Sequence, residues 1–406
     1  MIKCLSRLLA LPFICLSAGS LLAQVAIRAE TIHTMSGEPI RNGVILVRDG
    51  KIERVGPAAQ ITIPSQYRTL TAKVVTPGLI DAHTVVGLAG YLNQPHDQDQ
   101  LETSSAIQPE LRAIDSYNSR EKLVEYLRSY GVTTIHTGHA PGALVSGQTM
   151  ICKTVEMAGD ASVLVSEAMV AVTLGNAGLA GAGRSPGTRS KSVALLRAEL
   201  IKAQEYQTKM ESSPADKKPD RNLRSDTLGR VIKREIPLLV TANRATDILA
   251  ALRLAKEFNI RIVLDGAADA YLLIDQIKAA GVPVVVHATM ARAGGETENL
   301  TVENASKLTK AGIPVALQSG YENYVPKTRV VLFEAGVAAA NGLSFEQALS
   351  SVTIGAAKIL GIASRVGSIE AGKYGDLALF DGDPFEYTTH VVGVVINGQI
   401  VSQEVK

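Results

Sequence analysis

The feature that most constrains this 406-residue chain is a repeated alternation of short apolar strands with amphipathic helices across its middle. The helices place apolar residues at three- and four-residue steps, as in 245–258 and 270–280. Repeated strand–helix units favour a parallel sheet, and their number over about 290 residues fits a (β/α)8 (TIM) barrel better than an open sheet. We therefore expect an α/β fold with strands at 132–137, 236–241, 261–265, 282–287 and 313–318.

Both ends of the mature chain show short strands separated by tight turns. The dipeptides at 49–50 (Asp-Gly) and 397–398 (Asn-Gly) favour two-residue hairpins. We expect 24–73 and 365–406 to pair into one small β-sandwich domain, with the barrel at 74–364. A polar run at 210–233 is predicted to be a solvated loop.

The first 23 residues are typical of a signal peptide. Lys3 and Arg7 precede an apolar stretch at 8–23 that is shorter than the roughly 20 residues a spanning helix needs. We therefore expect a secreted, periplasmic protein without a permanent membrane anchor. Cys152 would then be the single remaining thiol, so stability has to come from the core and not from an internal disulfide.

Composition excludes two classes of protein. Hydrophobic residues make up 46% of the chain, which excludes intrinsic disorder. The 41 Lys and Arg are balanced by 39 Asp and Glu, so there is no basic excess to neutralise a phosphate backbone, and no nucleic-acid partner is expected. The remaining expectation is an enzyme-like scaffold for a small-molecule substrate or ligand.

The start of the predicted barrel carries a specific motif. Residues 74–83, Val-Val-Thr-Pro-Gly-Leu-Ile-Asp-Ala-His, resemble the opening strand of the amidohydrolase superfamily, in its imidazolonepropionase-like, periplasmic branch. Residues 367–373 and 375–381 are similar to the closing segments of that family. The resemblance implies a metal-dependent barrel with a flanking β-sandwich that hydrolyses amide, lactam or related carbon–nitrogen bonds in small substrates.

The chain departs from the family at its metal-ligand positions. Of the positions that can be placed, only His83 keeps a ligand, and one histidine cannot hold a catalytic zinc, which needs about three protein ligands. Val85 stands where the second histidine of His-x-His is expected. The other substituted positions are Thr241 and Asn243 for His-Ala-His, Gly266 for a histidine, and the run Gln318-Ser-Gly320 for Ser-Asp.

Two explanations of these substitutions stay open. A relocated divalent metal, most simply zinc, could be bound by His83 together with His96, Asp97, His136, His139 and His287, although each of these side chains could equally have a structural role. Alternatively the chain binds no metal, has lost hydrolysis and acts as a binding subunit or as the partner of an active amidohydrolase paralogue. The catalytic residues stay unassigned, because spacing along the chain gives no geometry.

Three charged residues are candidate substrate contacts. Glu110 and Arg112 lie in a segment that leads into a predicted barrel helix, and Arg244 follows a predicted strand. Glu110 and Arg112 could line the mouth of the barrel or could form a surface ion-pair network. Arg244 could face a substrate or could simply start a helix.

Overall fold

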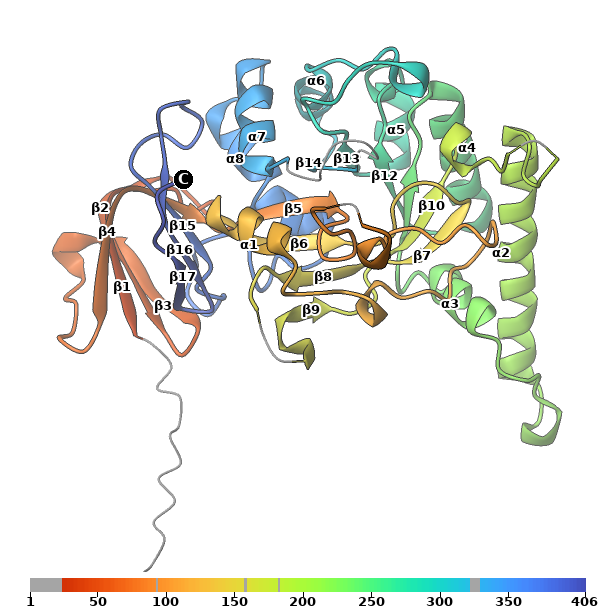
Figure 1. The fold of residues 1–406 in the computed structure, drawn as a ribbon, viewed down its shortest axis with the longest axis horizontal. Coiled ribbons are helices and arrows are strands. Elements are labelled where there is room, and N and C mark those ends of the chain that lie inside the picture. The colour runs from red at the N-terminus through yellow and green to blue at the C-terminus, as the bar shows by residue number, and fades with distance from the viewer. Residues whose placement is uncertain (1–23, 93, 157–158, 182, 322–328) are drawn as a thin grey trace, which may run out of the picture.

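The computed structural model describes residues 24–92, 94–156, 159–181, 183–321 and 329–406. The predicted signal peptide lies outside these residues, so export to the periplasm remains a prediction. In this part of the chain no helix is both long and apolar enough to cross a membrane. The fold belongs to the α/β class, and the described strands form three sheets (Figure 1).

Strands from both ends of the chain share one sheet, at the left of Figure 1. Its strands are β1 (Val25–Ile32), β2 (Ile40–Arg48), β3 (Lys51–Pro57), β4 (Arg68–Pro77), β15 (Leu377–Phe380), β16 (Val391–Ile396) and β17 (Gln399–Ser402). Strand β4 pairs in parallel with β1 and antiparallel with β15, which joins the two ends as expected. The domain boundaries near residues 73 and 365 remain a prediction.

The hairpins of this sheet follow from local turn chemistry. Asp49 and Asn397 have φ values of 52° and 51°, and a glycine with positive φ follows each of them. These left-handed conformations are those of a two-residue hairpin, in which aspartate, asparagine and glycine are tolerated best. The two dipeptides therefore fix β2 against β3 and β16 against β17.

The middle of the chain forms two further sheets. The six-stranded sheet contains β7 (Val145–Gln148), β10 (Val170–Thr173), β11 (Leu238–Thr241), β12 (Ile262–Gly266), β13 (Val284–Val286) and β14 (Val315–Leu317). The four-stranded sheet contains β5 (Leu79–Thr84), β6 (Val132–Thr137), β8 (Met150–Lys153) and β9 (Val163–Val165). One isolated bridge joins Thr84 to Gly320. The pairing of the described strands does not run continuously from the first sheet through the second and back. The two sheets therefore show an α/β fold but do not establish a closed barrel.

Helices pack around these two sheets (Figure 1). They are α1 (Lys122–Ser129), α2 (Arg189–Ser212), α3 (Leu223–Ile232), α4 (Ala245–Phe258), α5 (Ile274–Ala280), α6 (Asn304–Lys310), α7 (Val331–Ala340), α8 (Phe345–Ser351) and α9 (Ile354–Ile359). Helix α4 has the predicted bounds and ends at Asn259, which has a left-handed φ of 51°.

The predicted loop at 210–233 is wrong in part. Helix α2 continues to Ser212, and α3 occupies residues within the polar run. The Asn222 side chain caps α3 by accepting from the backbone N–H of Ser225, and Leu228 and Val231 are buried. Two buried apolar residues three apart thus fix a helix in a segment whose composition is otherwise polar.

Candidate active site

A polar residue follows the apolar residues of each of the parallel strands β11–β14, at the carboxyl end of the strand. Each strand contributes one residue to a single buried apolar cluster, namely Leu239, Val263, Val285 and Ala316. Because side chains alternate in direction along a strand, the residues two positions later face the same side. Those residues are Thr241, Asp265, His287 and Gln318.

Asp265 is the centre of a hydrogen-bond network. Its Oδ1 lies 2.9 Å from Nδ1 of His83, and the two residues are only 2% and 3% exposed respectively. Thr241 Oγ1 donates to Oδ2 of Asp265 at 2.6 Å, and Gln318 Nε2 donates to Oδ1 at 2.9 Å. Residues from β5, β11, β12 and the end of β14 therefore meet at one carboxylate.

His83 and Asp265 stabilise each other's charged forms. Burial lowers the pKa of His83, but the charge of Asp265 and its hydrogen bond outweigh burial, so that the pKa is raised. Burial raises the pKa of Asp265, but its bonds from His83, Thr241 and Gln318 outweigh burial, so that the pKa is lowered. The contact therefore favours the protonated imidazole of His83 and the ionised carboxylate of Asp265. The Nε2 atom of His83 is buried and has no hydrogen-bond partner among the described residues.

His136 is next to this pair, but both of its ring nitrogens are engaged. Its ring centroid lies 5.8 Å from that of His83. Nδ1 is 2.7 Å from the Ala82 carbonyl oxygen, and Nε2 is 2.6 Å from Oγ1 of Thr149. Burial, aided by the charge of His83, lowers the pKa of His136 to about 3. His136 is therefore a neutral, structurally bonded histidine.

His287 and His139 are also buried, and burial lowers the pKa of both, that of His139 to about 4. His287 Nδ1 is 2.9 Å from the Ala288 carbonyl oxygen, whereas its Nε2 has no partner in the described part of the chain. His139 packs against Gly147, where an added Cβ would come within 2.5 Å of the ring. His287 thus has one ring nitrogen without a partner, whereas both ring nitrogens of His139, which fills a tight space, lack one among the described residues.

The sequence model of the amidohydrolase family matches residues 88–402, which is most of the chain. The chain belongs to the amidohydrolase family. An imidazolonepropionase from Rhizorhabdus wittichii is 25% identical over 87% of this chain and 92% of its own length. Amidohydrolase tasK of Hapsidospora irregularis is 23% identical over 91% of this chain, which spans only 42% of that longer protein.

Solved structures agree with this assignment. The crystal structure of an amidohydrolase from Thermotoga maritima matches with a TM-score of 0.88 and 26% identity, covering 94% of this chain and 100% of that one. Together with the sequence relatives, it identifies the chain as an imidazolonepropionase-like amidohydrolase.

Members of the amidohydrolase superfamily typically bind divalent metals, but the residues described here do not fit a three-ligand zinc centre. No group of three or more His, Cys, Asp or Glu among them is placed to hold a metal ion. His96 is exposed on the turn at 95–97, and the Asp97 carboxylate accepts from Gln98 Nε2 at 3.1 Å. The network around Asp265 uses its oxygens and Nδ1 of His83 for hydrogen bonds.

The three predicted substrate contacts form ion pairs with other side chains. Glu110 lies 3.3 Å from Arg224, Arg112 lies 2.6 Å from Asp115, and Arg244 lies 2.7 Å from Glu298. The ion pairs of Glu110 and Arg112 correspond to the surface alternative considered for these two residues. Arg244 stands directly before α4, which corresponds to its own alternative of starting a helix. Their roles in substrate binding stay a prediction.

Asp265 was not among the candidate residues, because the resemblance to the family directed attention to its neighbour Gly266. The signal was present, since an aspartate inside the apolar strand 262–266 would be buried, and aspartate is almost never fully buried unless it is paired. Ser319, in the run where the family has Ser-Asp, donates its Oγ and its backbone N–H to Asp81. Burial raises the pKa of Asp81 to about 6.

A second buried carboxyl that the sequence did not reveal is Glu334 in α7, which is 0% exposed. Its Oε2 accepts from the Met290 backbone N–H at 2.9 Å, and Arg329 Nε lies 3.7 Å from Oε1. Burial, aided by the charge of Asp81, raises the pKa of Glu334 to about 7, although Met290 and Arg329 oppose the shift. This carboxyl is therefore held partly protonated near neutral pH.

We expect Glu334→Gln to stabilise the protein at about pH 8. Because the folded pKa lies above the unfolded value, the free energy of unfolding falls as the pH rises from about 4.5 to about 7. Glutamine cannot ionise and still accepts the Met290 bond, so the variant should gain about 2 kcal/mol at the higher pH and little at about pH 5. Urea denaturation at both pH values measures this, with exposed Glu346→Gln as the control. An equal effect at both pH values would rule out the titration of Glu334 as its cause.

Proposed function

We propose that this chain hydrolyses a non-peptide carbon–nitrogen bond in a small amide or cyclic amide, at a reaction centre formed by His83 and Asp265. Membership of the amidohydrolase family supports the class of reaction. The observation that carries the choice of site is the buried Nε2 of His83, which has no partner among the described residues while Asp265 holds the opposite ring nitrogen at 2.9 Å.

The chemistry follows from the charges of these groups. The imidazolium Nε2–H of His83 donates to the substrate carbonyl oxygen and stabilises the negative charge that develops there as water adds. Asp265 orients the ring and keeps it charged. His287, on the same face by strand alternation, has an Nε2 without a partner among the described residues. It takes a proton from the attacking water and delivers it to the leaving nitrogen as the carbon–nitrogen bond breaks.

We also infer that the two central sheets together form the family's (β/α)8 barrel. The Thr84–Gly320 bridge and the hydrogen bond from Gly320 N–H to the His83 carbonyl oxygen, 3.1 Å long, link β5 to the end of β14. Strands β7 and β8 follow each other along the chain with only Thr149 between them. In such a barrel the Asp265 network lies at the carboxyl ends of the strands, where active sites of this fold occur.

The test compares the purified protein with its His83→Gln variant on a panel of small amides, lactams and cyclic imides. We expect kcat/KM to fall about 10²-fold or more in the variant, because a neutral amide replaces the charged donor. His33→Gln, a partly exposed histidine beside Phe345, is the matched control and should keep full activity. Elemental analysis of each protein shows whether activity follows a bound metal. Unchanged kcat/KM in His83→Gln would refute this reaction centre.

A second candidate function is that of a non-hydrolytic binding or partner subunit for an active paralogue. It is favoured by the internal hydrogen bonds of the network, which occupy groups that could otherwise contact a substrate. Thr241 and Gln318 donate to Asp265, and both ring nitrogens of His136 have partners. It predicts no turnover on the same panel and co-purification with a paralogue that keeps His-x-His. Turnover by the isolated protein would exclude it.

A further inference from the structure

A cleft of ≈ 890 Å³ opens at the amino ends of β11, β12 and β13. Pro237, Ile262 and Pro283 line it from the starts of these strands, and the ends of α4 and α5 line it from the side. The Asp265 network lies at the opposite, carboxyl ends of the same strands. The cleft is therefore separate from the proposed reaction centre.

The cleft is cationic. The residues that line it in the described part of the chain include no aspartate or glutamate. Its four basic side chains differ from those arginines of the described residues that pair with carboxylates, as Arg197 does with Glu257 at 2.7 Å. The four are Arg234, Arg253, Lys256 and Arg261.

Contacts of these four residues leave their charge unneutralised. Arg234 donates to the backbone oxygen and to Oδ1 of Asn259, at 2.7 and 2.9 Å. Arg261 donates to the backbone oxygen of Glu235 at 2.6 Å. Across the described ranges, neither these two arginines nor Arg253 nor Lys256 forms an ion pair with a carboxylate.

The helix dipoles neutralise only part of this positive charge. Helices α4 and α5 both end at the cleft, and each carboxyl end contributes about half a negative charge. Four cations against about one negative charge leave an excess of roughly three positive charges. Stabilisation of the two helix ends therefore explains only part of the cluster.

The rest of the lining is apolar. Leu249, Leu252 and Ile359 are partly exposed in the cleft, beside Ile260 and Val282. A volume of this size suits a small organic ligand, since such sites commonly measure about 300–1,000 Å³. The cleft thus combines an apolar surface with a cationic one.

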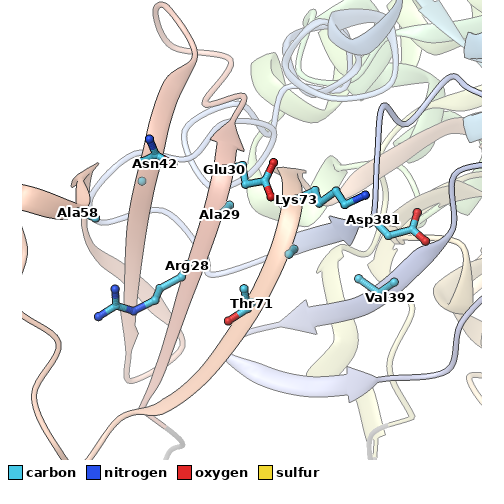
Figure 2. Close-up of a pocket in the computed structure, with 11 residues that line it drawn as sticks. Arg28, Ala29, Glu30, Asn42, Ala58, Thr71, Lys73, Asp381 and Val392 are labelled. Carbon is cyan, nitrogen blue, oxygen red and sulfur yellow. The ribbon is translucent and has the colours of Figure 1, made fainter.

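A second groove, on the seven-stranded sheet, lacks the excess of basic side chains found in the cleft. That groove has a volume of ≈ 490 Å³, and Figure 2 shows Arg28, Glu30, Lys73 and Asp381 among its lining residues. Its two basic and two acidic side chains balance, so it has no preference for an anion.

We propose that the cationic cleft binds an anionic amphiphile, a small molecule in which a carboxylate or phosphate is joined to an apolar chain. The anion lies among Arg253, Lys256 and Arg261, and the chain covers Leu249 and Leu252. Carboxylate and phosphate heads share the chemistry that the cleft recognises.

The test is isothermal titration calorimetry of the full protein with decanoate, decyl phosphate, decanol and inorganic phosphate at low ionic strength. We expect saturable binding of decanoate or decyl phosphate, and binding at least tenfold weaker for decanol and for inorganic phosphate. Tighter binding of decanoate indicates a ligand with a carboxylate head group, and tighter binding of decyl phosphate indicates one with a phosphate head group. The proposal is overturned if neither amphiphile binds saturably. It is also overturned if inorganic phosphate binds as tightly as the amphiphiles, because the cleft then holds an adventitious ion only.

Paired variants locate the binding. The double variant Arg253→Gln, Lys256→Gln should weaken binding of the amphiphile at least tenfold. The control Lys51→Gln, Arg54→Gln removes the same charge from exposed positions of β3 and should leave binding unchanged. Equal weakening in both double variants, with unchanged melting temperatures, would show attraction to net charge alone and overturn the site.

Discussion

An Asp265→Asn variant is expected to lose about 10²- to 10⁴-fold in kcat/KM on any substrate that the protein hydrolyses. The asparagine oxygen can still accept a bond from Thr241 or Gln318, so the fold should persist. The charge that holds His83 as an imidazolium is lost, however, and burial then lowers the pKa of His83. The carbonyl would face a neutral ring in place of a cation.

Two measurements separate this effect from general damage. Asp269→Asn is the matched control, because Asp269 is also buried after β12 but accepts from the Ala245 backbone N–H and not from His83. In the unmodified protein, one limb of the pH profile of kcat/KM should report the titration of His83. This limb should be lost in Asp265→Asn and kept in Asp269→Asn. Wild-type turnover by Asp265→Asn would remove the basis for the proposed reaction centre.

Lys153→Met is expected to destabilise the protein by about 3–5 kcal/mol, a fall in melting temperature of about 5 °C for a chain of this length. Lys153 is 2% exposed, and its Nζ lies 3.0 Å from Asp376 and 3.6 Å from the centroid of the Tyr374 ring. It also donates to Asn397 Oδ1. Removing the lysine leaves the Asp376 carboxylate buried without its cation, and this costs more than the ion pair contributes.

A double-mutant cycle tests that explanation. Lys153→Met combined with Asp376→Leu removes both charges, and it should recover most of the lost stability because an apolar pair replaces an ion pair. Thermal unfolding of the two single variants and the double variant measures the coupling. A double variant as unstable as the sum of its singles would show that the loss comes from packing and not from the unpaired charge.

Local signals predicted the parts of the fold that local chemistry determines. The hairpins at Asp49-Gly50 and Asn397-Gly398 follow from residues that tolerate positive φ. Helix α4 follows from a three- and four-residue apolar period. The loop predicted at 210–233 was wrong in part, because composition was weighed above the buried Leu228 and Val231.

The candidate site was predicted less well, because it depends on contacts between distant residues. His83 and Asp265 are 182 residues apart, and no spacing rule joins them. His83 was identified by resemblance, whereas Asp265 was passed over for its neighbour Gly266. Histidines chosen as possible ligands, such as His136 and His139, proved to be buried for different reasons, and only three-dimensional contacts distinguish those reasons.

The seven-stranded sheet has a consequence for the order in which the chain is made. Strand β4 needs β15 as its neighbour, yet β15 is synthesised only near the end of the chain. Until then the edge of β4 exposes unpaired backbone groups and apolar side chains such as Val75, a surface that invites intermolecular pairing. Nascent or truncated chains that stop before residue 377 should therefore depend on a chaperone to avoid aggregation, even though most of the helices and strands have already been made.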